Sequence, residues 1–506
     1  MKKVIYSLLF ACAVMLSSCE AYTDIQPKGM NLLSTTNELE MLLNAEIMIT
    51  SSDMREVAAD VIYGADNIPT LLSNPAMTRH KILVSLDDSQ MDLLGELTAS
   101  DGDYTSWYRC IGRIANPVLL QVDAAEGPES VKKQLKAEAL TIRAYFHWLL
   151  VNKFAKAYNP ATAATDPGIP YIKEDWDLTV PSEKLSVQKV YENIIQDIND
   201  AISLNALPSV NINLMRMNKA AAYAVKALAL MSMQDYTQAA SAAKEALAEN
   251  GNILNYNTST TMMQGVIMGG RYPVIFRQEL KCPEDYFYIY DKEIQYAMTP
   301  ETIAFFEPGH ACASKIANFN LMFDNIMDYG AIMLGLPGYK ITYDMTSGWN
   351  QSGLKSTHMY LILAECAIHE GKYDTAMEYL DQLRVNRIDP AQYAPLKGTV
   401  STEEDAILYL KKTSHGECLF SIYNFIQKKR WNELDNFKQS WHRDIFGTPY
   451  SIEPGSPLWI FPFPMNAVSL NPNLLPHNYK AAKNKQQAKT NAKFPLHYVL
   501  HNNRLC

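Results

Sequence analysis

Residues Thr357 to Arg387 read THMYLILAECAIHEGKYDTAMEYLDQLRVNR and predict two antiparallel helices joined by a tight turn. Apolar residues recur three and four positions apart on either side of Gly371, which is the spacing of amphipathic helices. Glycine tolerates the left-handed backbone angle that ends many helices, so Gly371 marks the turn. Ala364 and Ala376 are small enough to let the two backbones approach closely.

The spacing Gly371-x-Tyr373-x-x-Ala376 is the core of a tetratricopeptide-type helical hairpin. A weaker copy lies at Tyr223 to Leu247, YAVKALALMSMQDYTQAASAAKEAL, where Gln234 replaces the turn glycine. A single hairpin cannot bury its apolar face, so it must stack on other helices. We therefore expect a mainly α fold built from such hairpins.

The long insertion between the two copies, residues 251–353, has a different character. Helical periodicity fades there, and glycines and aromatic residues become frequent. Loops of this length are usually functional, so we expect an irregular, loop-rich capping region. The chain also holds 29 Tyr against 16 Phe, and tyrosine suits half-wet surfaces that stack on ligands.

Other helices are expected to supply the remaining core. Asp103 to Gln121 predicts a helix whose Tyr104, Trp107 and Tyr108 fall mainly on a core face. Trp148 belongs to the longest predicted helix and is likewise assigned to the core.

The N-terminus has the features of a secretory signal. Lys2 and Lys3 precede a mostly apolar run that is too short to span a bilayer as a permanent helix. The run ends in Leu16-Ser17-Ser18-Cys19, which resembles the bacterial lipoprotein lipobox. That resemblance implies cleavage before Cys19 and attachment of lipid to its sulfur. An ordinary signal followed by a coincidental cysteine is the other interpretation.

An ordered set of motifs resembles the SusD/RagB nutrient-binding lipoproteins of the Bacteroidetes outer membrane. The resemblance covers about residues 19 to 479. Its motifs are Asp24-Ile25-Gln26-Pro27, Glu138-Ala139-x-x-Ile142-Arg143-Ala144-Tyr145-Phe146, Trp148-Leu149-x-Val151, Gly168-Ile169-Pro170, Val190-Tyr191-x-x-Ile194-Ile195-x-Asp197 and Asn471-Pro472-Asn473-Leu474 with Tyr479.

The resemblance implies capture of an oligosaccharide or peptide at the cell surface. It implies transfer of that ligand to a SusC-like, TonB-dependent transporter, with the protein anchored in the outer membrane through its lipid. In this family the ligand surface is formed by loops opposite the helical scaffold. The equivalent candidates here are Asp66, Asn67, Tyr286, Tyr288, Tyr290, Tyr296 and Trp349. Tyr286, Tyr288 and Tyr290 alternate, which would place them on one face of an extended strand.

The resemblance and the composition together divide the chain into segments. We expect a signal peptide at 1–18, a lipidated tether at 19–29 and a single unit at 30–479. Within that unit the scaffold occupies 30–250 and 354–440, the ligand region 251–353, and a Pro-rich closing segment 441–479. Residues 480–506 form a basic tail that we expect to be disordered.

No enzyme signature is present: the chain has no GxSxG, HExxH, phosphate-binding loop or GxGxxG. The net charge of −9 argues against nucleic-acid binding, and no metal or cofactor motif is found. We therefore expect a binding protein and not an enzyme. Carboxylates are abundant, so a surface glycan hydrolase remains one alternative. A repeat scaffold that binds only proteins is the other.

Overall fold

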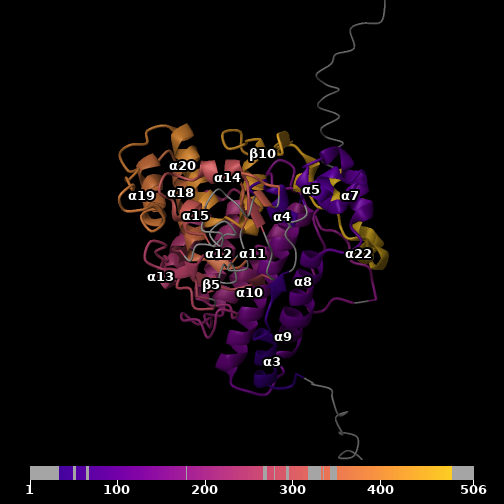
Figure 1. Ribbon diagram of the computed structural model, residues 1–506. Helices are drawn as coiled ribbons and strands as arrows, with labels where there is room; N and C mark the ends of the chain where they lie inside the picture. The colour runs from indigo at the N-terminus through magenta and orange to yellow at the C-terminus, as the bar shows by residue number, and fades with distance from the viewer. Residues whose placement is uncertain are drawn as a thin grey trace, which may run out of the picture.

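The computed structural model describes residues 33–49, 53–63, 68–177, 179–265, 270–278, 280–291, 296–316, 332–333, 335–341, 350 and 352–480. The fold is mainly helical, as predicted (Figure 1). Within these ranges, no helix has both the length and the apolar character that crossing a bilayer requires.

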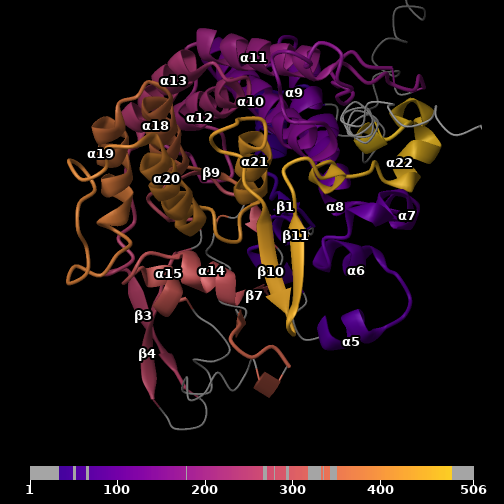
Figure 2. The same ribbon diagram turned by 90° about the horizontal axis from the view of Figure 1, so that it is seen from above.

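The scaffold is a stack of helix pairs in which successive helices from α10 to α20 pack on one another. The two predicted hairpins, α12–α13 and α18–α19, are far apart in sequence but adjacent in space, because α13 packs directly on α18 (Figures 1 and 2). Their apolar faces join one large core, which explains how the insertion is tolerated. The helices of the stack are α10 (Glu129–Phe154), α11 (Val187–Ser203), α12 (Lys219–Ser232), α13 (Tyr236–Glu249), α18 (Ser356–His369), α19 (Tyr373–Arg384), α20 (Glu403–Glu417) and α21 (Ile422–Trp431).

The N-terminal helices cover one end of this stack. Thr35 and Glu38 form a capping box that fixes the start of α3. The helix predicted across Asp103 to Gln121 is interrupted by η3, a π-helical turn between α8 and α9. The elements are α3 (Thr36–Leu43), α4 (Asp53–Val57), α5 (Ile68–Ser73), α6 (Arg79–Val84), η2 (Asp88–Gln90), α7 (Met91–Leu97), α8 (Gly102–Cys110), η3 (Ile111–Ala115) and α9 (Asn116–Gln121).

The insertion contains short strands and helices as well as loops. β2, β7 and β8 form one small sheet, and β1–β6, β3–β4 and β5–β9 form strand pairs. Figure 2 shows β3, β4, α14 and α15 on the opposite side of the molecule from α11 and α13. The elements of the insertion are β3 (Thr260–Gln264), β4 (Arg271–Ile275), β5 (Asp285–Phe287), β6 (Tyr290–Asp291), β7 (Tyr296–Met298), α14 (Pro300–Phe305), α15 (Ala311–Ser314) and β8 (Lys340–Ile341). Their partners from outside it are β1 (Met48–Ile49), β2 (Val61–Tyr63) and β9 (Leu354–Lys355).

The closing segment begins with the hairpin of β10 and β11 and then runs back over the N-terminal helices. Its backbone is held there because the Met465 and Asn466 N–H groups donate to the Thr98 and Ala99 carbonyls after α7. The elements are β10 (Trp441–Ile445), β11 (Thr448–Ile452), η4 (Pro457–Trp459), α22 (Met465–Leu470) and η5 (Pro472–Leu474).

The two hairpin turns have nearly the same backbone geometry although their residues differ. Gly371 has φ +69° and Gln234 has φ +64°, both in the left-handed region. A residue with a side chain pays roughly 1–2 kcal/mol for that conformation, whereas glycine adopts it freely.

We predict that Gln234→Gly raises the free energy of unfolding by about 0.5–1 kcal/mol, after the greater chain entropy of glycine is deducted. Gly371→Ala should lower it by about 1 kcal/mol, and no atom lies within 4 Å to clash with the new methyl group. Thermal unfolding of the two variants checks this. Shifts of the same sign would contradict it.

Candidate functional site

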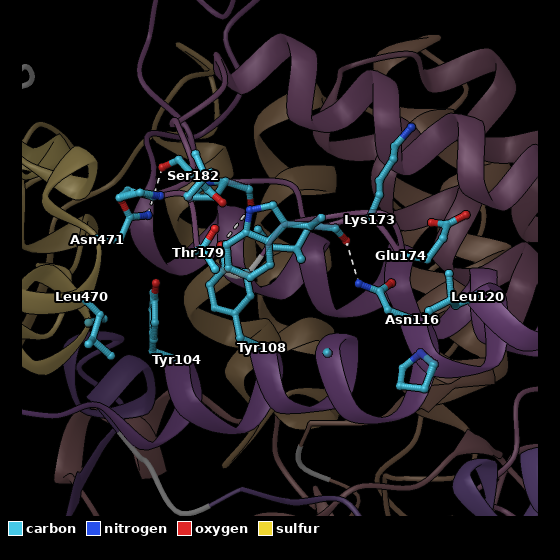
Figure 3. A pocket seen from close by; sticks show the side chains of 18 of the residues that line it. Tyr104, Tyr108, Asn116, Leu120, Lys173, Glu174, Thr179, Ser182, Leu470 and Asn471 are labelled. Carbon is cyan, nitrogen blue, oxygen red and sulfur yellow. Dashed lines mark hydrogen bonds between the residues drawn. The ribbon is translucent and has the colours of Figure 1, made fainter. Parts of the chain in front are cut away.

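An open groove lies between the N-terminal helices and the loop that joins α10 to α11. Its volume is about 690 Å³, and α22 closes one end (Figure 3). Pockets of this size commonly hold small organic ligands. Its lining comes from α8, η3 and α9 on one side and from residues 170–182 on the other, with Leu33, Ala467, Leu470 and Asn471 at the ends.

Three aromatic side chains line the groove. Tyr104 and Tyr108 lie one helical turn apart on α8, with ring centroids 4.8 Å apart, and both rise toward the loop in Figure 3. Trp176 comes from the loop, and 38% of its surface is exposed. The Tyr108 hydroxyl donates to the Pro170 carbonyl at 2.9 Å, so this ring also fixes the loop. Two separate segments thus supply the aromatic surfaces of one groove.

A buried arginine holds the loop against the helices. Arg143 donates to both oxygens of Asp197 at 2.6 and 2.8 Å, to Asn116 Oδ1 at 3.4 Å, and to Glu174 in the loop. Burial alone would raise the pKa of the Glu174 carboxyl, but a backbone hydrogen bond and Arg143 hold that pKa below its usual range. Arg143 and Asp197 are motif residues of the family resemblance. Their role in this structure is to position the loop wall of the groove.

His147 supports the same loop from below. Its Nε2 accepts from the Ile172 N–H at 3.0 Å, and its ring stacks on Tyr171 with centroids 3.7 Å apart. Because Nε2 is an acceptor, Nδ1 carries the proton and donates to the Arg143 carbonyl at 2.9 Å. Burial lowers the pKa of His147 to about 3, so the ring is neutral at pH 7.

The π-helical turn η3 forms part of the groove floor. Gly112 lies in this turn and lines the groove, and no atom lies within 4 Å of the position a Cβ would take. Single π turns inside α-helices occur frequently at functional sites. The interruption of the helix therefore supports the groove as the site, independently of its volume.

The rim of the groove is mostly apolar. Leu120 and Leu470 are 57% and 83% exposed, and Val180 is also exposed. Polar groups are fewer: the Asn471 amide donates to the Ser182 carbonyl at 2.9 Å, while the buried Ser182 hydroxyl has no hydrogen-bond partner among the described residues. The groove therefore offers apolar and aromatic faces with a small number of hydrogen-bonding groups.

The predicted ligand residues whose side chains are described, Tyr286, Tyr288 and Tyr290, do not line the groove. Asp66, Asn67 and Trp349, like the lipidation residue Cys19, fall outside the described residues, and so does the side chain of Tyr296. Their roles stay predictions. Among the ranges that the structure describes, no group of three or more His, Cys, Asp or Glu side chains is placed to hold a metal ion.

The expectation that three alternating tyrosines share a ligand-facing side needs correction. Tyr286 and Tyr288 are only 0% and 1% exposed, because β5 pairs with β9 and packs on α12. The Tyr286 hydroxyl donates to the Asn250 carbonyl at 2.5 Å. Tyr290 is half-buried and meets Tyr288 edge to face, with ring centroids 5.2 Å apart. The rings of Tyr286 and Tyr288 thus serve the core.

Sequence reasoning placed Tyr104 and Tyr108 mainly in the core with Trp107. Trp107 is fully buried, as is Trp148, whereas the two tyrosines are half-buried and line the groove. The sequence feature that could have indicated the groove was the pair of tyrosines one helical turn apart on the predicted helix. The loop that brings Trp176 opposite them could not be placed from sequence.

Stacked helix pairs with an inserted region and an open groove define a tetratricopeptide-like binding scaffold. Residues 38–229 match the model of the SusD-like family, described as "Starch-binding associating with outer membrane". The resemblance to this family is thus confirmed by sequence over those residues. No curated protein sequence matches the chain.

Solved structures confirm that the chain has the SusD-like fold. A SusD superfamily protein from Bacteroides thetaiotaomicron superposes with a TM-score of 0.63 at 15% identity, covering 87% of this chain and 98% of that one. A SusD-like carbohydrate-binding protein from Bacteroides vulgatus gives 0.58 at 14% identity, with coverage of 87% and 98%. One from Bacteroides fragilis gives 0.58 at 13% identity, with coverage of 87% and 99%.

The low pKa of His147 predicts a pH dependence of stability. Below about pH 6.5, its ordinary pKa, the unfolded chain binds a proton that the folded chain does not bind until about pH 3. The free energy of unfolding therefore decreases as the pH is lowered through this window, by up to about 1.4 kcal/mol per pH unit for this group.

Urea unfolding from pH 7 to pH 4 checks the prediction. His147→Gln should make the decline of the unfolding free energy shallower, by up to the roughly 1.4 kcal/mol per pH unit that one proton contributes. His442→Gln, which changes an exposed ring, should leave the slope unchanged. An unchanged slope in His147→Gln would refute the assignment.

Proposed function

We propose that the protein is a lipid-anchored outer-membrane binding protein that captures an oligosaccharide in the groove without cleaving it. The observation that carries this proposal is the groove itself, where half-exposed aromatic rings from α8 and from the α10–α11 loop face one space. Sugar rings present C–H faces that stack on aromatic rings, and hydroxyls that bond to groups such as Thr179 and Asn471. The family description and the carbohydrate-binding relatives support the same class of ligand.

A peptide is the second candidate ligand. The exposed apolar side chains of Leu120, Val180 and Leu470 at the rim suit apolar peptide side chains better than sugar hydroxyls. The same aromatic surfaces would serve either ligand, so the two are separated by titration.

The proposed partner is a SusC-like, TonB-dependent transporter that receives the captured ligand. The description of the matching family as associating with the outer membrane supports this placement. A stable complex of this kind needs an interface well above the ~1,200 Å² of weak encounters. Asp66, Asn67, Tyr290, Tyr296 and Trp349 remain proposed as a second ligand contact.

Trp176→Ala is predicted to weaken glycan binding about five- to thirtyfold, since the loss of one stacked ring costs about 1–2 kcal/mol. Calorimetric titration with a panel of oligosaccharides and peptides measures this. Phe276→Ala, which removes another half-exposed aromatic ring, is the matched control and should bind normally. Trp349→Ala tests the second contact in the same titration.

The outcomes separate the rival functions. Binding with the ligand recovered intact supports the proposal, and loss of binding in Trp349→Ala alone would move the site to the insertion. Cleavage of the glycan would instead identify a hydrolase. Absence of binding to every glycan and peptide would favour a scaffold that binds only proteins.

Cys19→Ser is predicted to release the protein from the membrane fraction, because the acyl chains attached at this sulfur would supply the anchoring energy. Cell fractionation measures this release, and metabolic labelling by palmitate measures the loss of the acyl chains. Cys110→Ser, at a buried free thiol, is the control and should stay labelled and membrane-bound. Continued labelling of Cys19→Ser would exclude Cys19 as the acylated residue.

A further inference from the structure

The helical side of the groove is a single ridge of residues spaced four apart. Side chains at this spacing lie one above another on a helix, because about 3.6 residues make one turn. The ridge residues that line the groove are Tyr104, Tyr108, Gly112, Asn116 and Leu120. Figure 3 shows the members that have larger side chains in this order along the groove floor. The ridge therefore has a notch, at Gly112, between the side chains of Tyr108 and Asn116.

The fold itself does not require a glycine at position 112. The φ angle of Gly112 is not positive, so any residue can adopt its backbone conformation. A Cβ built on it meets no atom within 4 Å, so crowding does not exclude a side chain either. Within a helix, glycine is less favourable than every residue except proline. The glycine thus weakens the helix without any gain in packing, and its effect falls on the groove.

The side chains on either side of the notch are held by the opposite wall. The Tyr108 hydroxyl donates to the Pro170 carbonyl at 2.9 Å, and the Asn116 amide donates to the Ile172 carbonyl at 3.3 Å. Both bonds keep these side chains from turning into the notch. The Cα atoms of Tyr108 and Asn116 are separated by roughly 12 Å along the helix axis, at 1.5 Å per residue. Gly112 is exposed, so its backbone forms the bottom of the notch.

The notch offers mainly carbon surfaces to a ligand. The hydroxyl of Tyr108 and the amide of Asn116 already bond to the loop, which leaves the Tyr108 ring and the Gly112 Cα as its surfaces. Pro117 adds a further apolar ring to the groove lining beside them. Sugar rings carry C–H groups on their faces and hydroxyls around their edges, so a C–H face matches these surfaces.

We propose that Gly112 determines which ligands the groove accepts, because the notch admits one sugar ring of the bound oligosaccharide against the backbone. The C–H groups of that ring lie against the Gly112 Cα and beside the Tyr108 ring. A side chain at position 112 fills this space and keeps the sugar ring out. The role of Gly112 rests on the glycan binding proposed above.

The test titrates the full-length protein with the oligosaccharide panel used for Trp176→Ala. The panel includes maltoheptaose, because the matching family is described as starch-binding. Gly112→Leu should weaken binding at least about tenfold, since a leucine overfills the notch. Gly112→Ala should weaken binding less, and it should raise the melting temperature by about 0.5–1 °C because alanine is the better helix former.

Arg113→Leu is the matched control for a leucine placed in the same turn. Arg113 is exposed in η3 but does not line the groove, so this variant should bind the oligosaccharide normally. Weaker binding by Gly112→Ala together with a higher melting temperature is the expected result. A purely structural role of the glycine cannot produce that pair of changes.

The other results overturn the proposal in distinct ways. Normal binding by both Gly112 variants, with weak binding by Trp176→Ala, overturns the role of Gly112 and leaves the proposed function standing. A lower melting temperature in Gly112→Ala shows that the fold requires the glycine, which also overturns it. Absence of oligosaccharide binding to the wild-type protein overturns the proposed function as well. If the Gly112 variants lose only peptide binding, a peptide side chain and not a sugar ring occupies the notch.

Discussion

The buried guanidinium of Arg387 is the interaction on which the junction between scaffold and insertion depends. It donates to Glu417 at the end of α20 at 2.6 and 3.0 Å and to Glu284 of the insertion at 3.1 Å. It also lies 3.8 Å from the centroid of the Tyr256 ring. Burial would raise the pKa of Glu284, but Arg277 and Arg387 hold it well below its usual range. Removing one partner from such a buried set typically costs about 3–5 kcal/mol.

Arg143 plays the same role for the α10–α11 loop that Arg387 plays for the insertion. Irregular backbone carries polar groups that a helical core cannot satisfy, so it must be tied down by side chains. Arg143 ties the α10–α11 loop to α11 and α9, as Arg387 ties the insertion to α20. Guanidinium suits both places because its donors are fixed in a plane and reach several acceptors at once. The helices form the frame, and the two arginines hold the irregular segments in fixed positions on it.

Local pattern was enough to predict the two helical hairpins, although it did not reveal the π-helical turn between α8 and α9. The hairpin around Gly371 and the weaker one around Gln234 have the predicted helices and turns, because their periodicity, small residues and turn positions all favour one structure. The groove was not predicted, since Trp176 reaches α8 only through the long-range bonds of Arg143, Tyr108 and His147. Tyr286 and Tyr288 show the opposite failure. Their alternation fits a strand, but alternation cannot reveal that both rings are buried where β5 pairs with β9 at its edge and packs on α12.

The stacking of α13 on α18 has an evolutionary consequence. The chain leaves the helical frame at Gly251 and returns to it at Ser356. There the Tyr360 hydroxyl donates to the Gly251 carbonyl, and the Ser356 hydroxyl donates to the Asn252 carbonyl. Because these bonds hold the exit and the entry side by side, the insertion between them is a closed loop. The entropic cost of closing such a loop rises by only about 0.6 kcal/mol for each doubling of its length. Evolution can therefore exchange, lengthen or trim the insertion while the helical frame that carries it is kept.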